Sequence, residues 1–402
     1  MKKQILSTSA IALGVAMAAP ASAQEWDMDW GGFANTHIGI SSVDRNFAST
    51  ADNDGVNVYT NSELIFSPSV TLDNGMTFGF NVQMEALNGG GGADGIDESY
   101  VTISSDTLGR IDLGSENSAG YRSMVAAPQV GSMPINSRST SAFVPVTASG
   151  GFRQAGLSSY TEVGGNNDVQ RITYFTPSFN GLTLGVSYAP SNSGNASNNA
   201  PVNFNAAGNI TDIFDLGISY SQSFNGVDID LGARWGTGER NAAGAIPAGC
   251  QNAGGFFVAG GGTCPAGSTT VAAGRSATTN GDPETWGLGG SVSVSGFTFG
   301  VGYAENDQDL AGNVGDQKGL SVGVAYDLAG PWTVGLEGYF GEVDNGPGVD
   351  EDEYDAIKLA ASRSLGAGVS WDVYYFRQET KNGATGAEIE GDVIATAINL
   401  SF

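Results

Sequence analysis

The side chains that most often carry enzyme chemistry are scarce in this 402-residue chain. His37 is its only histidine, so a Ser-His-Asp arrangement could use no other residue as its base. His37 lies between Thr36 and Ile38 in an alternating segment, where a polar position of a β-strand is the simpler interpretation. The glycine runs at residues 89–92 and 260–262 lack the Lys-Ser/Thr pair and the helix that follow a phosphate-binding loop. The sequence therefore predicts no catalytic site.

The two cysteines, Cys250 and Cys264, lie in a Gly/Ala-rich segment at residues 241–280 that we expect to be a long loop. A zinc or redox site would need more ligands than this segment offers. In an exported protein, which folds in an oxidising compartment, a disulfide bond that closes the loop is the expected arrangement.

Two acidic segments offer oxygen ligands of the kind that Ca²⁺ prefers. One is Asp52-Asn53-Asp54-Gly55, and the other spans residues 344–353. Neither has the Glu spacing of the twelve-residue calcium loop, so no dedicated metal site or cofactor is predicted. A solvated acidic rim is the alternative, with divalent cations that bridge it to the phosphates of lipopolysaccharide.

The first 23 residues have the layout of a secretory signal peptide. Lys2 and Lys3 are followed by a mostly apolar stretch at residues 5–19 and by the small-residue cleavage pattern Ala21-Ser22-Ala23. We expect the mature chain to span residues 24–402. It has no run of about 18 apolar residues that could form a membrane-spanning helix. The net charge of −26 argues against nucleic acid as a partner.

The elements that must position the remaining charged residues are β-strands. Residues 76–86 place Met, Phe, Val and Ala on one face and Thr, Asn, Gln and Glu on the other, which is the two-residue period of a strand. The same pattern recurs along the whole chain, and its apolar face usually ends in Tyr, Trp or Phe. Aromatic residues at both ends of an apolar face are typical of strands that cross a membrane.

The connections alternate between tight turns and long polar loops. Asn-Gly turns such as Asn180-Gly181 and Asn225-Gly226 supply the positive φ that hairpins need. We expect an all-β fold, an antiparallel transmembrane barrel of 16 strands. The strands should begin near residues 30, 56, 76, 96, 109, 168, 181, 211, 226, 284, 296, 317, 331, 353, 368 and 389.

The polar faces of these strands would point into the barrel. They carry the acidic residues Glu63, Glu85, Glu98, Asp112, Asp228, Asp230, Glu337 and Asp372, and the basic residues Arg110, Arg171, Arg234 and Lys358. An excess of acid in a polar lumen favours the passage of cations. Alternatively, pairs such as Arg110 with a neighbouring carboxylate cancel much of this field. Inward aromatic residues are few (Tyr59, Tyr100, Tyr339 and Tyr374), so no aromatic ladder for a selected substrate is apparent.

Three features resemble the general porin family of Gram-negative bacteria, over essentially all of the mature chain. The last strand ends at Phe402, residues 99–104 and 109–114 resemble the strand pair before the family's third loop, and residues 177–182 resemble one of its periplasmic turns. The resemblance implies an outer-membrane homotrimer that passes small hydrophilic solutes and ions, with Phe402 recognised by the barrel-assembly machinery. His37 would then face the lumen or the trimer interface. A substrate-selective channel, a structural or adhesive barrel and an outer-membrane enzyme are the alternatives.

Residues 117–167 form the candidate third loop, which the resemblance implies is folded into the barrel. Family porins usually carry acidic residues on this loop, whereas here Glu162 is the only acid beside Arg122, Arg138 and Arg153. Either these arginines face wall carboxylates such as Glu63 and Glu85, or they bind acids at the root of the loop, such as Glu116. The stretch at residues 141–146 also predicts a partly apolar constriction.

Overall fold

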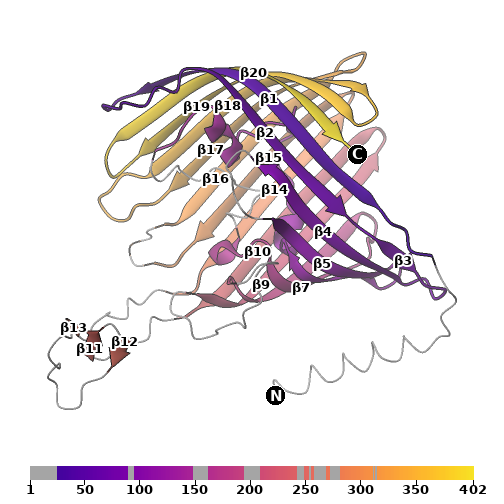
Figure 1. Ribbon diagram of the computed structural model, residues 1–402. Coiled ribbons are helices and arrows are strands. Elements are labelled where there is room, and N and C mark those ends of the chain that lie inside the picture. Colours follow the sequence, from indigo (N-terminus) through magenta and orange to yellow (C-terminus); the bar gives the residue numbers. More distant parts are fainter. Residues whose placement is uncertain are drawn as a thin grey trace.

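The computed structural model is a closed antiparallel β-barrel in which each strand pairs with its neighbours in sequence (Figure 1). It describes residues 25–88, 95–147, 162–193, 209–241, 249–252, 255–257, 269–271, 281–310, 312 and 315–402. The barrel closes because the first strand pairs with both the second and the last. The segments Gly55–Phe66 and Ser69–Thr71 lie end to end and both pair with the strand Thr77–Asn88. Counted together as one position, they give a wall of 16 strand positions.

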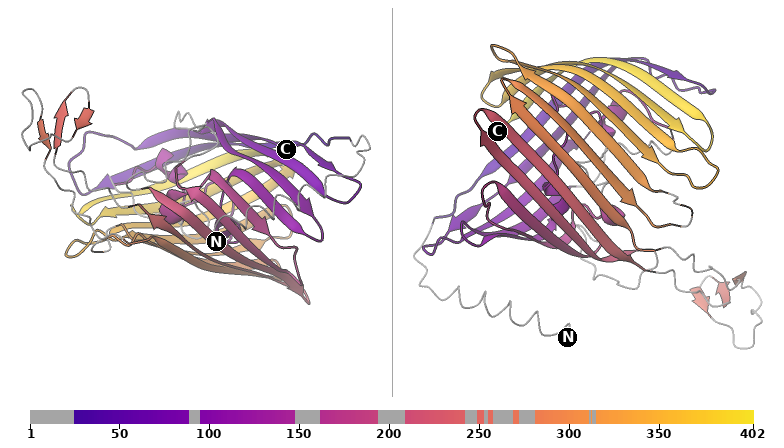
Figure 2. Two further views of the ribbon diagram at one scale, coloured as in Figure 1. Left: turned by 90° about the horizontal axis from the view of Figure 1, so that it is seen from below. Right: turned by 180° about the vertical axis from the view of Figure 1, so that it is seen from behind.

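The wall begins with β1 (Trp30–Arg45), β2 (Gly55–Phe66), β3 (Ser69–Thr71), β4 (Thr77–Asn88), β5 (Ile96–Ser105), β6 (Gly109–Glu116), β7 (Val169–Phe175) and β8 (Leu182–Ser191). It continues with β9 (Ile210–Phe224), β10 (Val227–Arg240), β14 (Glu284–Val294), β15 (Phe297–Asp307), β16 (Gln317–Asp327), β17 (Trp332–Val343), β18 (Asp352–Gly366), β19 (Val369–Asn382) and β20 (Ala387–Ser401). The strands tilt together around the wall, as a closed barrel requires (Figure 2).

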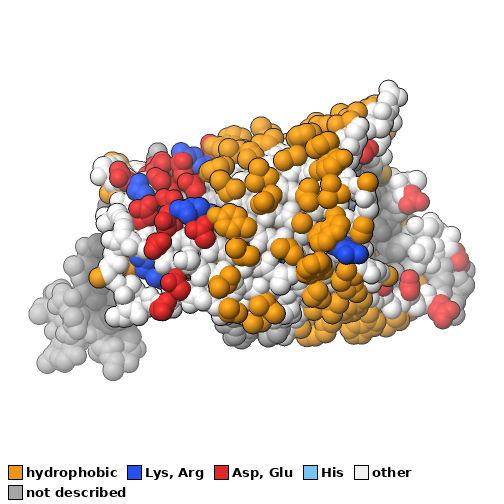
Figure 3. Space-filling view, turned by 90° about the horizontal axis from the view of Figure 1, so that it is seen from above, with side chains coloured by type: hydrophobic (Ala, Val, Ile, Leu, Met, Phe, Trp, Pro, Cys, Tyr) orange, Lys and Arg blue, Asp and Glu red, His pale blue; other side chains and the backbone are white. Residues whose placement is uncertain are grey.

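The side chains alternate between the two faces of the wall as the sequence predicts. On β9, Leu216 and Ile218 are exposed on the outside, whereas Asp215 and Gly217 are buried on the inside. The outward side chains form an apolar band around the barrel (Figure 3). Aromatic pairs lie at both edges of this band, for example Phe297 with Tyr326 and Trp286 with Tyr303. Such a band suits the hydrocarbon layer of a membrane.

The predicted strand starts are confirmed to within two residues, because alternation and turn chemistry agree along the whole chain. Asn180 and Asn225 have φ values of 49° and 51°, and a glycine with positive φ follows each of them. The sequence did not predict β3, which is separated from β2 at Pro68, a residue without an N–H to pair. It also did not predict the small sheet of β11 (Gly249–Asn252), β12 (Gly255–Phe257) and β13 (Thr269–Val271).

In the described residues between β6 and β7 lie the helical turns α2 (Ala119–Arg122), η1 (Arg138–Ala142) and η3 (Val163–Gly165). Within the described ranges, no helix has the length and apolar character needed to cross a membrane. These turns belong to the long segment that the sequence singled out as the third loop.

Candidate functional site

We call the segment from β6 to β7 the inner loop (residues 117–168), and its described parts, residues 117–147 and 162–168, lie against the inner face of the wall (Figure 1). The wall residues that contact the loop alternate with the outward apolar residues, so they lie on the inner face. Gly217, between the exposed Leu216 and Ile218, is an example. From α2, which packs on β8, β9 and β10, the loop follows the wall past β14 to β20 and then reaches β1 and β2. At its far end, Asn57 of β2 donates to the Ala142 carbonyl. The described part of the loop therefore lines most of the barrel's circumference.

The loop turns away from β6 through a capped helical turn. The Ser118 hydroxyl accepts a hydrogen bond from Tyr121 N at 3.0 Å, which satisfies one of the free amides at the start of α2. The same hydroxyl donates to Glu162 Oε1 at 2.7 Å. Ser118 thus joins the outgoing arm of the loop to its returning arm.

Charged side chains hold the loop at this root. Arg122 pairs with Asp112 at 2.8 Å and with Glu116, and its guanidinium lies over the Phe175 ring, 4.7 Å from the centroid. Arg110 shares Asp112 with it at 2.8 Å. Asp112 and Glu116 are buried, whereas the side chain of Arg110 is 38% exposed and that of Arg122 is 27% exposed. The root is therefore ionic, and its basic side faces the barrel interior.

A second ionic group lies fully inside the protein. Arg234 of β10 pairs with Asp215 of β9 at 2.7 Å and with Glu162 of the returning arm at 3.1 Å. All three side chains are at most 1% exposed. Because a buried charge without a partner is costly, these three residues depend on one another. They tie the returning arm to the wall.

The far part of the loop is bound through its backbone. Val130 N and Ser132 N each donate, at 2.8 Å, to Glu337 of β17 and Asp372 of β19, respectively. Lys358 of β18 donates to the Met133 carbonyl at 2.6 Å and pairs with Glu337 at 3.0 Å. The hydroxyl of Tyr354 donates to the carbonyl of Ile135 at 2.6 Å, and Gln378 binds the carbonyl of Val144. Most of these hydrogen bonds reach the backbone of the loop, so they depend on the path of the loop rather than on the type of its side chains.

The same part of the loop packs an apolar core inside the barrel. Met133, Ile135, Phe143 and Val144 are at most 3% exposed. They lie in one cluster with wall residues of β1 and β17 to β20: Val43, Tyr339, Tyr354, Ala356, Ala360, Tyr374, Phe376, Ile389, Val393, Ala395 and Ala397. Burial of these side chains stabilises the loop on the wall.

Two titratable groups of the loop have shifted pKa values. Burial, together with the nearby Glu162, raises the pKa of Tyr121 to about 12. Burial also raises the pKa of Asp168 to about 8, and the neighbouring Asp97 and Glu98 add to this shift because a second negative charge is unfavourable beside them. Asp168 is therefore mainly protonated at neutral pH.

A profile of the Gram-negative porin family matches residues 7–383. The chain belongs to this family. No curated protein matches this porin. Among solved structures, it resembles the anion-selective porin from Comamonas acidovorans, with 15% identity, a TM-score of 0.56 and coverage of 94% of this chain and 100% of that one. It also resembles Salmonella typhi OmpF in complex with daunomycin, with 13% identity, a TM-score of 0.54 and coverage of 93% of this chain and 97% of that one. For the trimer form of Vibrio cholerae OmpT the identity is 11% and the TM-score 0.54, with coverage of 94% of this chain and 99% of that one. At these identities the structural likeness shows the fold.

The inward charged residues of this porin fall into two sets. Glu63, Arg110, Arg122, Asp228 and Asp230 keep contact with water inside the barrel. Others that the sequence placed on the lumen face do point inward, but the loop and its anchors cover them: Glu98, Asp112, Glu116, Arg171, Arg234, Glu337, Lys358 and Asp372. Glu85 is partly buried beside Glu63. The covered residues bind or surround the loop and do not contact solvent in the lumen.

The structure distinguishes between the two arrangements that the sequence left open for the loop arginines. Arg122 binds Glu116 and Asp112 at the root rather than Glu63 or Glu85. Arg138 lies exposed in η1 beside β2, and Arg153 lies outside the described residues. The apolar stretch at residues 141–146 does not form an apolar constriction, because Phe143 and Val144 face the wall. His37 points inward, and its Nδ1 lies 2.9 Å from the Tyr374 hydroxyl.

Other predicted positions have structural roles or lie outside the described residues. The Asp54 carboxylate accepts from Val43 N, and that of Asp352 accepts from Asn345, so both acidic segments form bonded turns. Among the described residues, no group of three or more His, Cys, Asp or Glu side chains is arranged to hold a metal ion. Cys264 and the proposed signal peptide are outside the described residues, as is the side chain of Cys250, so the disulfide and the cleavage stay predictions. Phe402 is 70% exposed, and its backbone pairs with Gly32.

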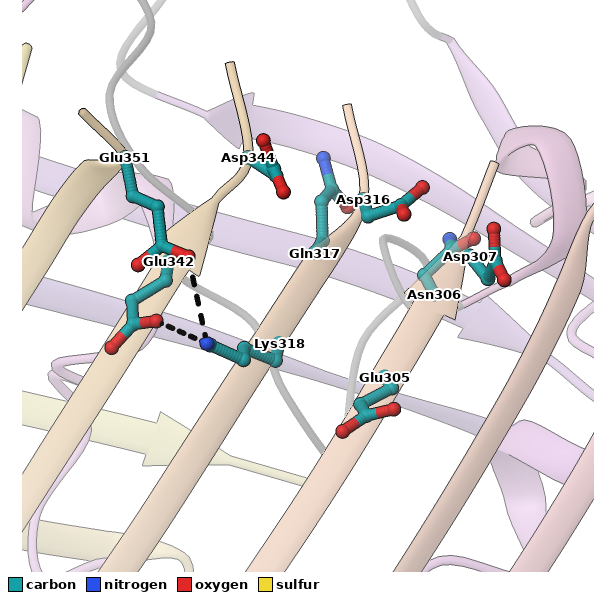
Figure 4. Close-up of a pocket in the computed structure, with 9 residues that line it drawn as sticks. All are labelled: Glu305, Asn306, Asp307, Asp316, Gln317, Lys318, Glu342, Asp344 and Glu351. Carbon is teal, nitrogen blue, oxygen red and sulfur yellow. Dashed lines mark ion pairs between the residues drawn. The ribbon is translucent and has the colours of Figure 1, made fainter. Parts of the chain in front are cut away.

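A hollow lies at the rim of the barrel where the long loops are, beyond the apolar band (Figure 4). Lys318 of β16 extends between Glu342 and Glu351 and pairs with them at 2.6 and 3.7 Å. The hydrogen bond that the Glu351 carboxyl donates to Glu342 raises the pKa of Glu351, and burial raises the pKa of Asp316, with the nearby Asp307 adding to the effect. Acidic and basic side chains gather at the same level on the outside of the barrel (Figure 3).

Several residues that hold the inner loop were not singled out from the sequence. Asp215 lies between the outward Phe214 and Leu216, and Tyr354 shares the strand period of the inward Lys358, so the period was sufficient to place both inside. Gln378 and Phe376 are inward on β19 for the same reason. Tyr354 and Gln378 bind loop residues more than 200 positions away in the sequence, so no local pattern indicated these contacts.

Proposed function

We propose that this porin forms a water-filled channel through which small hydrophilic solutes and ions diffuse across the outer membrane. The observation that carries this proposal is a closed barrel with an apolar outer band and charged inner side chains that contact water, such as Arg110 and Asp228. The inner loop lies along the wall, which suits a channel that is narrowed rather than plugged.

Conductance of the purified, refolded protein in planar lipid bilayers tests the proposal. We expect stepwise current increases of uniform size in symmetric salt. Absence of steps from protein that migrates as a folded barrel on unheated gels would rule out an open channel and favour a structural or adhesive barrel.

We also infer a weak preference for cations. Glu63, Asp228 and Asp230 face the interior and form no ion pair with Lys or Arg in the part of the chain that the structure describes. Among the inward basic residues, Arg110, Arg122, Arg234 and Lys358 are each paired with a carboxylate, and Arg171 is buried against the Asn166 carbonyl, away from the lumen. The remaining field is therefore acidic, and it attracts cations.

The reversal potential in a salt gradient measures this preference. Wild-type protein should be cation-selective, and the triple variant E63Q/D228N/D230N should be less so. The control is E305Q, on the outer face near the rim, which should retain the wild-type value. An anion-selective wild type would contradict the inference on charge and leave the channel intact.

Diffusion suits the interior better than a substrate-selective pathway. The inward aromatic residues Tyr339, Tyr354 and Tyr374 are at most 3% exposed beneath the inner loop, so they offer no aromatic ladder to a solute. The absence of enzymatic activity stays a prediction.

We propose that the porin self-associates, as a homotrimer, through the outer face of β1 and β2. There the apolar band is interrupted by the small cross-strand pairs Ala34 with Ser62 and Thr36 with Thr60. Small and hydroxyl side chains in a membrane are typical of protein interfaces rather than of lipid contact. T60W should convert the trimer band on unheated gels to a monomer band, whereas I218W on the outer face of β9 should not. An unchanged trimer in T60W would place the interface elsewhere.

The outer surface is also proposed to contact lipids, with lipopolysaccharide at the long-loop rim. The rim continues the outward face directly beyond the apolar band and carries both signs of charge, including Lys318, Arg377 and Lys381. Divalent cations would bridge its acids to lipid phosphates. Chelation of divalent cations should release bound lipopolysaccharide from purified trimers, and no release would count against this contact.

We also propose that the barrel-assembly machinery recognises Phe402 at the end of the last strand, where its side chain is exposed.

A further inference from the structure

A row of glycines crosses the inner face of the barrel on six successive strands, β9, β10 and β14 to β17. We call it the glycine track, and its members are Gly217, Gly232, Gly289, Gly300, Gly323 and Gly335. None of the six has a positive φ, so the strands themselves do not require glycine there. Glycine within a strand often marks a place where another part of the chain approaches closely.

The inner loop occupies this track from α2 to Val130. A Cβ at Gly232 would lie 2.7 Å from Val125 N, and one at Gly300 would lie 2.9 Å from Ala126 O. At Gly217 and Gly289 the Cβ would overlap loop carbonyl oxygens, and at Gly335 it would lie 2.5 Å from a Val130 methyl group. Ordinary contacts are 3.5–4.0 Å, so an added Cβ would require a shift of about 1–2 Å at Gly217, Gly232, Gly289 and Gly335, and a smaller one at Gly300 and Gly323. Most of the obstructing atoms are backbone, so the loop itself would have to move.

Little else holds this stretch of the loop. In the described ranges, the hydrogen bond between residues 124–129 and a wall side chain is the one that Ala127 N donates to the Ser321 hydroxyl oxygen at 3.5 Å. By contrast, six wall side chains bind the described backbone at residues 130–144. The position of residues 124–129 is therefore set mainly by how closely they fit against the wall.

We propose that the glycine track determines how far the inner loop stands from the wall, and thereby the width of the channel. The track is a recess one Cβ deep, and side chains in it would push the loop towards the barrel axis. This inference rests on the proposed function, because width matters only in an open channel. The six glycines are positioning residues, since they act on solutes through the loop.

Single-channel conductance of alanine and valine variants tests the inference. We expect G232A and G289A to conduct less than wild type in the same salt, and G289V to conduct less than G289A. The matched control is G290A, one residue from Gly289 on the outer face, where the new Cβ would lie 2.9 Å from the end of the flexible Leu231 side chain and 3.3 Å from the Asp230 carbonyl oxygen, and would meet no part of the inner loop. G290A should keep the wild-type conductance. Unchanged or increased conductance in folded G232A and G289A would overturn the proposal.

A compensating pair keeps the test decisive if those variants fail to fold. At Gly335 the obstructing atoms belong to the Val130 side chain rather than to the backbone. G335A should lower conductance, and G335A/V130A should restore it, because the removed methyl groups make room for the new one. A double variant that conducts no better than G335A would also overturn the proposal. A wild-type protein without conductance would instead refute the channel itself, so the two failures are distinguishable.

Discussion

The inner loop is held in two different ways at its two ends. At the root, between β6 and β10, buried ionic groups fix it: Arg122 with Asp112 and Glu116, and Arg234 with Asp215 and Glu162. In the far half, residues 130–147, apolar side chains pack on β17 to β20 and β1, and wall side chains bind the loop backbone. The root is held by specific charged pairs, whereas the far half is held mainly by apolar side chains that fill space and by hydrogen bonds to the loop backbone.

This difference predicts different responses to substitution. Removal of one member of a buried ionic group leaves the others charged and without a partner, which costs more than the pair itself contributes. Removal of an apolar side chain leaves a cavity whose cost depends on how well the site collapses. A loop can shift towards the wall more readily than a strand can, so the far half should tolerate change better.

The largest loss of stability is expected at Arg234. R234M leaves Glu162 and Asp215 buried without their cation and should lower the free energy of unfolding by about 3–5 kcal/mol. Urea unfolding in detergent, followed by circular dichroism, measures this loss.

The matched control removes the whole ionic group. In R234M/E162Q/D215N no buried charge is left without a partner, so most of the lost stability should return. If the triple variant is as unstable as R234M, steric fit rather than charge holds the root, and the distinction between the two halves disappears.

A smaller loss is expected in the far half at Phe143, whose side chain is 3% exposed and covers Gly39 of β1. F143A should cost about 3 kcal/mol, the low end of the range for a buried phenylalanine, because the loop can close part of the cavity. The same urea experiment measures it.

Gly39 offers a compensating variant. A Cβ there would lie 2.7 Å from the Phe143 ring, so G39A alone should destabilise the protein. In the F143A background the same methyl group fills part of the cavity, and G39A/F143A should be more stable than F143A. Simple additivity of the two losses would show that Phe143 and Gly39 are not packed against each other.

A still smaller effect is expected for the hydrogen bond from the Tyr354 hydroxyl to the Ile135 carbonyl, 2.6 Å long. Y354F removes one uncharged donor and should cost about 1 kcal/mol in the same unfolding assay. Y326F, in the outer aromatic stack with Phe297, is the control and should change stability by less than about 0.5 kcal/mol. A loss for Y354F as large as that for R234M would mean that the far half is as specific as the root.

The barrel was predictable from the sequence because each strand carries its own signal. Alternation places Leu216 outside and Asp215 inside without knowledge of any partner, and Asn225-Gly226 specifies its turn locally. The break at Pro68 and the short β11 to β13 sheet lack such repetition, so they were missed.

The inner loop was predictable only at its root. Arg122 is six residues from Glu116, and pairing with acids at the root such as Glu116 was one of the two arrangements that the sequence left open; its pairing with Asp112 was not predicted. The far half depends on partners such as Tyr354 and Gln378, which meet residues 135 and 144 only because the barrel closes. For the same reason, the stretch that includes Phe143 was interpreted as an apolar constriction, since no local pattern distinguishes a side chain that faces the wall from one that faces water.

The prediction that tests the root through its pH dependence concerns Asp168. Burial and the neighbouring Asp97 and Glu98 raise its pKa to about 8, so the folded protein holds a proton that the unfolded chain releases near pH 4. Stability from this group is fully present below about pH 4, falls as the pH rises, and is lost above about pH 8. D168N keeps the uncharged form at every pH, so its advantage over wild type should grow from pH 5 to pH 8 and stay constant at pH 9. Unfolding free energies at these values measure it, with D106N in the exposed turn after β5 as the control that should follow wild type. Parallel curves for D168N and wild type would show that the root tolerates this charge, and the contrast with the far half would then rest on Arg234 and its partners alone.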